Sequence, residues 1–238
     1  MPDSPARLLL FDIDGTLVHT GRAGQRGMNA AFERLYGHPG ALDQVSLAGR
    51  TDRAIVAEVF RAIGRADAAG SDDEVFRLRD LYLEHLGLEI VRPGPHPFGV
   101  LPGVTPLLEA LAGEPTAVIA LLTGNFEGGA AIKLGHFDLW RRFAFGAFGD
   151  RHVNRRDLVP IALAQARAAG HTGLDAADVV VIGDTPLDVD CAIAHGARAL
   201  GVATGSFTVG ALRDAGAHHA VDTLEDAAPI VRWMLREA

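Results

Sequence analysis

Two aspartates directly follow a short apolar run near the start of the chain. Residues 11–17 read Phe-Asp-Ile-Asp-Gly-Thr-Leu, after three consecutive leucines. The apolar run predicts a buried strand, so Asp12 and Asp14 would lie where that strand ends. Clustered carboxylates beside a core are costly unless a cation or a reacting group balances their charge. The pair therefore indicates a reaction centre.

A second pair of acids follows another apolar run. Residues 179–182 read Val-Val-Val-Ile, and Asp184 and Asp188 come shortly after them. Mg²⁺ prefers oxygen ligands in near-octahedral geometry and keeps several waters. Asp12 and Asp184, with a backbone carbonyl and a phosphate oxygen, would satisfy it. Asp184 could instead cap the next helix, but acids at the ends of two strands favour a metal site.

The triplet Thr123-Gly124-Asn125 follows a third apolar run. A hydroxyl and a glycine at the start of a helix suit a phosphate, which binds there through N–H groups and the helix dipole. A helix N-cap explains the triplet equally well by itself. Its position after a strand is what makes it a candidate phosphate site.

The elements that must position these residues form an alternation of strands and helices. Short apolar runs alternate with helix-length amphipathic segments, which predicts an α/β fold with a Rossmann-like parallel sheet covered on both faces. The expected strands are 8–12, 117–122, 143–148, 179–182, 199–202 and 220–221, and the expected helices 104–111, 126–134, 158–168 and 186–194. The ligand crevice of such a sheet lies at the carboxyl ends of its strands, where all three candidate groups fall.

A helical insertion interrupts this alternation. Residues 21–90 carry three helical patterns, at 24–36, 52–63 and 73–86, and no convincing strand. Breaker-rich residues 92–99 and the segment near 18–24 are expected to be linkers. We therefore expect a core domain of residues 1–20 and 95–238 and a helical cap domain of residues 21–94. Because both linkers border the Asp12 motif, the cap would close over the carboxylates as a lid.

The composition limits the class of partner and the compartment. The 238 residues carry a formal net charge of −8, which argues against nucleic acids and anionic membranes as partners. No apolar run is long enough to span a membrane, and the one before Asp12 is too short for a signal peptide. Cys191 is the only cysteine, so no intrachain disulfide can form. We expect a cytoplasmic protein with a small diffusing substrate, and the sequence predicts no oligomeric state.

In order and spacing these stretches resemble the motifs of the haloacid dehalogenase (HAD) superfamily of phosphohydrolases. The insertion lies where one subclass has its cap, between the first and second motifs, and length and cap placement resemble phosphoglycolate phosphatases. The resemblance implies that Asp12 is the nucleophile and Asp14 the general acid/base. It assigns Thr123, Gly124 and Asn125 to the phosphate. It also implies Mg²⁺ held by Asp12, the Asp14 carbonyl and Asp184, with Asp188 as a ligand or an acceptor behind them.

One motif departs from the superfamily pattern. The third motif normally supplies a lysine ahead of a helix, but residues 148–158 contain none. The only lysine of the chain, Lys133, falls within a predicted helix, where we expect it to be solvent-exposed. Arginine must then balance the charge of nucleophile and phosphate, and a guanidinium can grip two oxygens while staying cationic. Arg155 is the first candidate and Arg156 the second.

The predicted activity is Mg²⁺-dependent hydrolysis of a small phosphate monoester through a phosphoaspartate. A phosphomutase or another HAD phosphotransferase remains an alternative, as does a non-catalytic HAD-like binding module. Dehalogenases of the superfamily lack an acid at the position of Asp14, and phosphonate-cleaving members need a cap lysine that residues 21–90 lack. In the cap, Arg50 would either contact an anionic substrate tail or be solvated, with Thr51 or Asp52 capping a helix.

Overall fold

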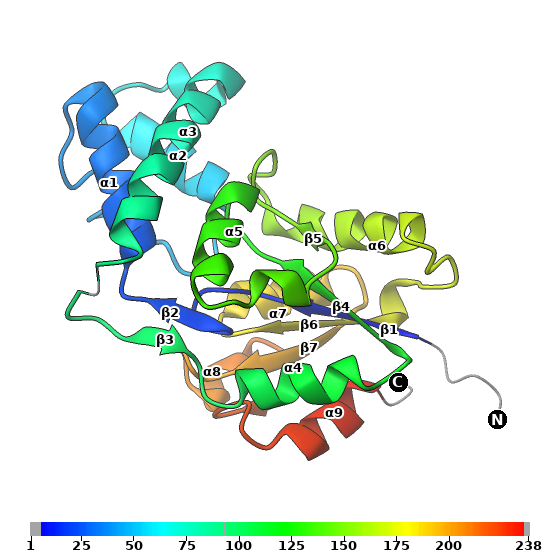
Figure 1. Ribbon diagram of the computed structural model, residues 1–238. Coiled ribbons are helices and arrows are strands. Elements are labelled where there is room, and N and C mark those ends of the chain that lie inside the picture. Colours follow the sequence, from blue (N-terminus) through cyan, green and yellow to red (C-terminus); the bar gives the residue numbers. More distant parts are fainter. Residues whose placement is uncertain (1–5, 93, 236–238) are drawn as a thin grey trace.

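The computed structural model describes residues 6–92 and 94–235. Its central feature is a sheet of six parallel strands in the order β5-β4-β1-β6-β7-β8 (Figure 1). This confirms the predicted α/β fold. The strands are β1 (Arg7–Phe11), β4 (Ala117–Leu122), β5 (Gly146–Ala147), β6 (Val179–Gly183), β7 (Arg198–Val202) and β8 (His219–Val221).

The sheet is buried because both of its faces carry apolar side chains. β1 lies between β4 and β6, and all five of its residues are buried. Leu9 and Phe11 pack with α4 (Val104–Ala112) and α9 (Ala227–Leu235) on one face. Leu8 and Leu10 pack with α6 (Leu158–Ala168) and α7 (Pro186–Ile193) on the other. Figure 1 shows α4 and α9 together below the sheet. Helices on both faces explain why these strands read as continuous apolar runs rather than alternating ones.

Four of the core helices begin and end close to their predicted positions, and two further ones, between residues 209 and 235, were not predicted. They are α4 (Val104–Ala112), α5 (Glu127–His136), α6 (Leu158–Ala168), α7 (Pro186–Ile193), α8 (Val209–Asp214) and α9 (Ala227–Leu235). The strand expected at 143–148 shrinks to β5, because it is the sheet edge and pairs with β4 over two residues. Among the described residues no helix has both the length and the apolar character needed to cross a membrane.

Short strands in the two predicted linkers pair with each other. β2 (Val18–Thr20) and β3 (Phe98–Val100) form an antiparallel two-stranded sheet. The sequence did not predict these two strands, because Pro97 and Gly99 mask a strand of three residues whose partner lies some 80 residues earlier. Pro93, in the predicted linker, and residues 1–5 and 236–238, in the predicted core domain, lie outside the described residues.

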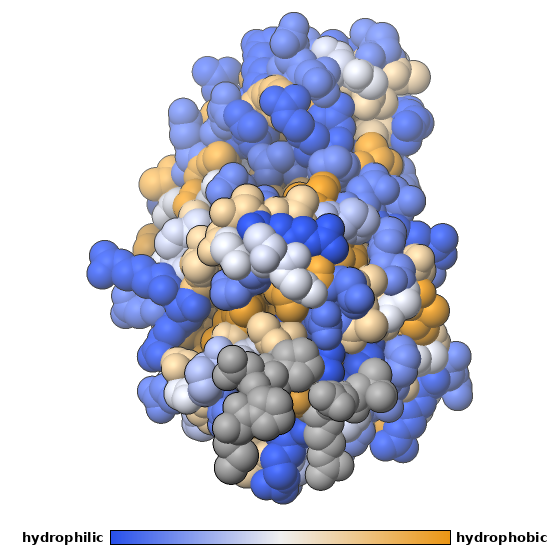
Figure 2. Space-filling view, turned by 90° about the vertical axis from the view of Figure 1, so that its right-hand side faces the viewer, coloured by the Kyte–Doolittle hydropathy of each residue, from blue (hydrophilic) through white to orange (hydrophobic). Residues whose placement is uncertain are grey.

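The inserted helices share an apolar cluster of their own. They are α1 (Ala23–Tyr36), α2 (Asp52–Ala62) and α3 (Asp72–Glu89), and they stand beyond β2 and β3 at the upper left of Figure 1. Phe32, Phe60 and Tyr82 are buried in this cluster together with Phe126, which directly precedes α5. The inserted helices therefore pack on α5. Figure 2 shows a face on which hydrophilic residues predominate and hydrophobic ones lie in small groups.

Candidate active site

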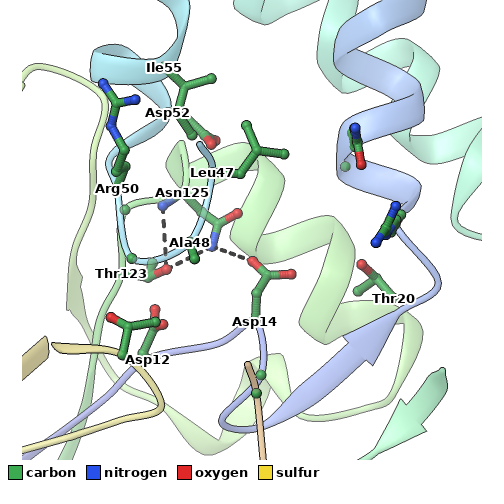
Figure 3. A pocket seen from close by; sticks show the side chains of 18 of the residues that line it. Asp12, Asp14, Thr20, Leu47, Ala48, Arg50, Asp52, Ile55, Thr123 and Asn125 are labelled. Carbon is green, nitrogen blue, oxygen red and sulfur yellow. Dashed lines mark hydrogen bonds between the residues drawn. The ribbon is translucent and has the colours of Figure 1, made fainter. Parts of the chain in front are cut away.

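A cavity of about 480 Å³ lies where the strands that flank β1 end. Asp12 and Asp14 enter it after β1, Thr123 after β4 and Asp184 after β6. Residues of the inserted helices line the opposite wall (Figure 3). From β1 the chain builds the sheet outward on one side through β4 and β5 and on the other through β6, β7 and β8, so the strand order reverses at β1. In open parallel sheets, ligands bind in the crevice at this point.

Three buried carboxylates gather at the floor of the cavity, which Asp12 and Asp184 line and Asp188 does not. Asp12, Asp184 and Asp188 each offer an oxygen, and these oxygens all lie within 4.8 Å of one another. Burial raises the pKa of Asp12 to about 6, although the guanidinium of Arg155 opposes the shift. Burial and the charges of Asp188 and Asp12 raise the pKa of Asp184 to about 8. Such mutually repelling oxygens fit a hard cation, which would balance their charge.

Glycines let the chain wrap closely around Asp184. Gly15 has φ +83°, and a Cβ there would lie 2.5 Å from Asp184 Oδ2. A Cβ at Gly205 would overlap the same oxygen. The backbone thus approaches the carboxylate from two sides in a way that other residues would prevent.

Arg155 is buried against the carboxylates, whereas Arg156 lies at the surface. The Arg155 Nη2 is 3.1 Å from Asp12 Oδ1 and 2.5 Å from Asp188 Oδ1. Although burial disfavours its charge, Asp12 and Asp188 raise the pKa of Arg155, so it stays cationic. Arg156 forms an exposed ion pair with Asp190 instead. The structure therefore places the first candidate for the missing lysine, and not the second, beside the predicted nucleophile.

Asp188 links Arg155 to the start of α7. Its Oδ1 accepts from Arg155, and its Oδ2 accepts from the Thr185 N–H at 3.0 Å and the Thr185 hydroxyl at 2.7 Å. Both oxygens are therefore engaged in holding neighbours in place. Of the two roles left open by the sequence, this arrangement favours Asp188 as the acceptor behind the metal site.

The predicted phosphate-binding triplet lies just before α5. The side chain of Asn125 donates to the Thr123 hydroxyl at 2.7 Å and to Asp14 Oδ2 at 2.9 Å (Figure 3). A Cβ at Gly124 would overlap the carbonyl oxygen of Arg50. This glycine thus allows the inserted segment to touch the core backbone, a requirement that the sequence did not reveal.

Lys133 was predicted to be solvent-exposed, but the structure shows it buried. It is 5% exposed, and its Nζ lies 2.6 Å from Asp14 Oδ2 and 2.6 Å from Asn125 Oδ1. The prediction was wrong because the inserted helices cover this side of α5. A signal was present: Lys133 follows Phe126 by seven residues and Ala130 by three, so it shares their buried helix face.

Arg50 lines the cavity but is paired within the inserted helices. Its Nη1 is 2.6 Å from Glu58 Oε2 and 3.1 Å from the Ser46 carbonyl. In Figure 3 its guanidinium points away from Asp12. Thr51, rather than Asp52, caps α2, because its hydroxyl accepts from the Ala54 N–H. Contact between Arg50 and a substrate stays a prediction.

Asp52 joins the inserted helices to the core. Its N–H donates to the Gly124 carbonyl at 2.7 Å, and its Oδ2 accepts from the Phe126 N–H at 2.9 Å. Thr51 adds a bond from its hydroxyl to the Val153 carbonyl at 3.1 Å. Burial at this contact raises the pKa of Asp52 to about 6, although Lys133 opposes the shift.

The raised pKa makes the contribution of Asp52 to stability depend on pH. The folded protein favours the protonated acid, so the stabilisation is complete below the unfolded pKa of about 3.8 and is lost as the pH rises through 6. Asp52→Asn keeps an acceptor for the Phe126 N–H but cannot ionise. As the pH rises from 4 to 7.5, we expect its free energy of unfolding to increase by about 2 to 3 kcal/mol relative to that of the wild-type protein. Urea unfolding measures this difference.

The exposed Asp67, in the same inserted region, provides the matched control. Asp67→Asn makes the same chemical change at the surface, so it reports the general effect of losing one carboxylate. If the free energies of unfolding of Asp52→Asn and Asp67→Asn changed with pH in the same way, burial would not disfavour the ionised form of Asp52, and the prediction would be wrong.

Comparison with known proteins agrees with this geometry. Residues 9–192 match the haloacid dehalogenase-like hydrolase family, and residues 159–227 match a HAD hydrolase-like family. The probable phosphatase IndB of Dickeya dadantii is 28% identical over 233 residues, which cover 96% of this chain and 95% of that protein.

Solved structures share the fold. A hydrolase from Pseudomonas syringae has a TM-score of 0.68 at 20% identity, covering 95% of this chain and 98% of its own. A predicted phosphoglycolate phosphatase from Haemophilus somnus has a TM-score of 0.68 at 19% identity, and the match covers 95% of this chain and 98% of that one. A β-phosphoglucomutase from Clostridium difficile has a TM-score of 0.70 at 16% identity, and the match covers 97% of both chains. With a family match that spans most of its length, the chain belongs to the haloacid dehalogenase-like hydrolases.

Proposed function

We propose that this protein is a Mg²⁺-dependent phosphatase that hydrolyses a small phosphate monoester through a phosphoaspartate at Asp12. The observation that carries the proposal is the charge arrangement around Asp12. The buried Asp12 carboxylate lies 3.1 Å from the cationic Arg155 and within 4.8 Å of oxygens of Asp184 and Asp188, at a cavity that also receives Asp14. The likeness to the probable phosphatase IndB supports the same activity.

The metal and the nucleophile would share the floor of the cavity. Asp12, Asp184 and the Asp14 carbonyl would hold Mg²⁺, with Asp188 behind them. When bound, the ion offsets the repulsion between a carboxylate and a phosphate dianion. Asp12 would attack phosphorus in line with the leaving oxygen, and Arg155 would grip the transferring oxygens. Thr123, Gly124 and Asn125 would bind the same phosphoryl group.

Asp14 would move the protons. Its carboxyl would protonate the leaving alkoxide during transfer to Asp12, and as a base it would then activate the water that hydrolyses the phosphoaspartate. Its side chain is 43% exposed, in contrast to the buried floor of the cavity. It can therefore reach both a leaving group and an incoming water.

The substrate is proposed to be a small phosphorylated metabolite. The cavity volume of about 480 Å³ suits a small molecule, and the contacts of Asp52 and Thr51 with the core hold the inserted helices over one side of it. We propose residues 21–94 as the cap domain that selects the leaving group. Closure of this kind excludes water and strengthens the charge contacts.

Phosphomutase activity is the second candidate, because β-phosphoglucomutases are among the proteins with this fold. That likeness, at 20% identity or less, concerns the fold alone, so the charge arrangement and the likeness to IndB favour the phosphatase. A non-catalytic role is disfavoured, since a scaffold gains nothing from mutually repelling buried acids. Release of free phosphate, rather than transfer to a second sugar phosphate, distinguishes the two activities.

Phosphate release from p-nitrophenyl phosphate tests the proposed function. We expect activity with Mg²⁺, a fall of at least about 100-fold after treatment with a chelator, and recovery when excess Mg²⁺ is added, because the metal contributes several kcal/mol to the transition state. Recovery controls for damage by the chelator. Activity that survives chelation unchanged would exclude the metal-dependent mechanism. A panel of phosphorylated metabolites then identifies the leaving group.

A further inference from the structure

The only lysine of the chain is buried beside the proposed general acid. Lys133 lies on α5, one turn before its end, and its side chain is 7% exposed. Its Nζ donates to Asp14 Oδ2 and to Asn125 Oδ1, both at 2.6 Å. A buried ammonium is costly unless it is paired and hydrogen-bonded, so its position calls for a specific partner.

The surroundings of Lys133 direct its ammonium toward Asp14. A Cβ at Gly24 of α1 would lie 3.3 Å from Nζ and 3.5 Å from the Tyr82 hydroxyl of α3, so the inserted helices wall the lysine on that side. The charge of Lys133 also acts on Asp52, where it opposes the rise in pKa that burial causes. Among the described residues, however, the ion pair of Lys133 is with Asp14.

Lys133 does not replace the lysine that the third motif lacks. Arg155 already lies 3.1 Å from Asp12, on the floor of the cavity. Lys133 instead comes from α5 and binds Asp14, two residues after Asp12. The two cations therefore serve two different carboxylates: Arg155 balances the proposed nucleophile, and Lys133 balances the proposed general acid.

The hydrogen bonds to Asp14 are directional. Asn125 Nδ2 and Lys133 Nζ both donate to Oδ2, at 2.9 Å and 2.6 Å. Asn125 is itself fixed, because it donates to Thr123 and accepts from Lys133. Two donors on one oxygen fix the plane of the carboxyl group and leave Oδ1 as the oxygen that can carry the proton.

We propose that Lys133 is a positioning residue for proton transfer, which clamps Asp14 Oδ2 so that Oδ1 faces the leaving-group oxygen. The inference rests on the proposed phosphatase activity. As the bond from Asp12 to phosphorus forms, the bond from phosphorus to the ester oxygen breaks and its electron pair goes to that oxygen. The oxygen takes the proton from Asp14 Oδ1, which leaves Asp14 as a carboxylate that accepts both hydrogen bonds.

The dependence on the leaving group tests this role. Lys133→Met keeps the length of the side chain and removes its charge and donors. We expect its kcat/KM for β-glycerophosphate, whose alkoxide needs a proton, to fall at least about 100-fold. For p-nitrophenyl phosphate, whose phenolate departs without a proton, we expect a fall below about fivefold. The parameter kcat/KM reports the steps through cleavage of the ester bond, so hydrolysis of the phosphoaspartate does not blur the comparison.

A double-mutant cycle assigns the effect to Asp14. Asp14→Asn should show the same selective loss on β-glycerophosphate, and adding Lys133→Met to it should cost little more. Equal losses on both substrates in the single variant, with an active unchanged enzyme, would overturn the positioning role and leave the phosphatase proposal standing. Absence of activity from the unchanged enzyme on every phosphate ester would instead overturn the proposed function.

A second measurement does not depend on the folding of a lysine variant. Since the chain has one lysine, ¹³Cε-lysine labelling gives a single side-chain signal. We expect this signal to shift in Asp14→Asn and to stay unchanged in Asp67→Asn, at the surface of the inserted helices. An unshifted signal in Asp14→Asn would show that the two side chains do not interact, and the inference would fail.

Discussion

Asp12→Asn is expected to lower kcat on p-nitrophenyl phosphate by at least about 10³-fold, because a carboxamide is a poor nucleophile toward phosphorus. The loss should appear with every phosphate ester, since each would pass through the same Asp12 adduct. Steady-state phosphate release measures it. A rate near that of the unchanged enzyme would show that Asp12 is not the nucleophile, and the phosphoaspartate mechanism would be wrong.

The stability of this variant separates lost chemistry from lost structure. Asp12 lies within a cluster of acids whose repulsion helps to raise its pKa. Removing its charge should relieve Asp184 and Asp188, so the variant is expected to unfold at a denaturant concentration no lower than the unchanged protein when no metal is added. Asp67→Asn, at the surface, is the control for the assay and should keep full activity.

The central sheet could be predicted because its signals are local. β1, β4 and β6 are buried on both faces, so each appears as an uninterrupted apolar run that ends at a polar residue. The same runs locate Asp12, Thr123 and Asp184, since parallel strands end at one edge of the sheet. The predicted HAD family is confirmed by the match of residues 9–192.

The features that the sequence did not reveal depend on contacts between distant segments. β2 and β3 pair across the whole insertion, and three residues with a central Gly99 carry no strand signal. Lys133 is buried only because the inserted helices pack on α5, for example through Leu83 against Gly128. A charged residue on a helix face suggests solvent until the element that covers it is known.

The two neighbouring arginines provide the second large effect and contain their own control. Arg155→Ala is expected to lower kcat/KM roughly 30- to 1000-fold, which corresponds to a loss of about 2 to 4 kcal/mol of transition-state stabilisation. The substitution removes the cation that faces the transferring oxygens and Asp12. Arg156→Ala should change it by less than about threefold, because its exposed ion pair with Asp190 contributes little. Measurement of both variants with p-nitrophenyl phosphate checks this.

Arg155→Lys then separates charge from geometry. The guanidinium of Arg155 uses two nitrogens, since Nη2 lies beside Asp12 and Asp188 while Nη1 donates to the Gly49 carbonyl. A lysine offers all its donors from a single nitrogen. We expect the lysine variant to recover part of the activity lost in Arg155→Ala, because the positive charge near Asp12 returns while the bridge to the Gly49 carbonyl of the inserted segment does not. Equal losses at Arg155 and Arg156, or a larger loss at Arg156, would reverse the assignment and place the cation that grips the phosphoryl group on the surface arginine.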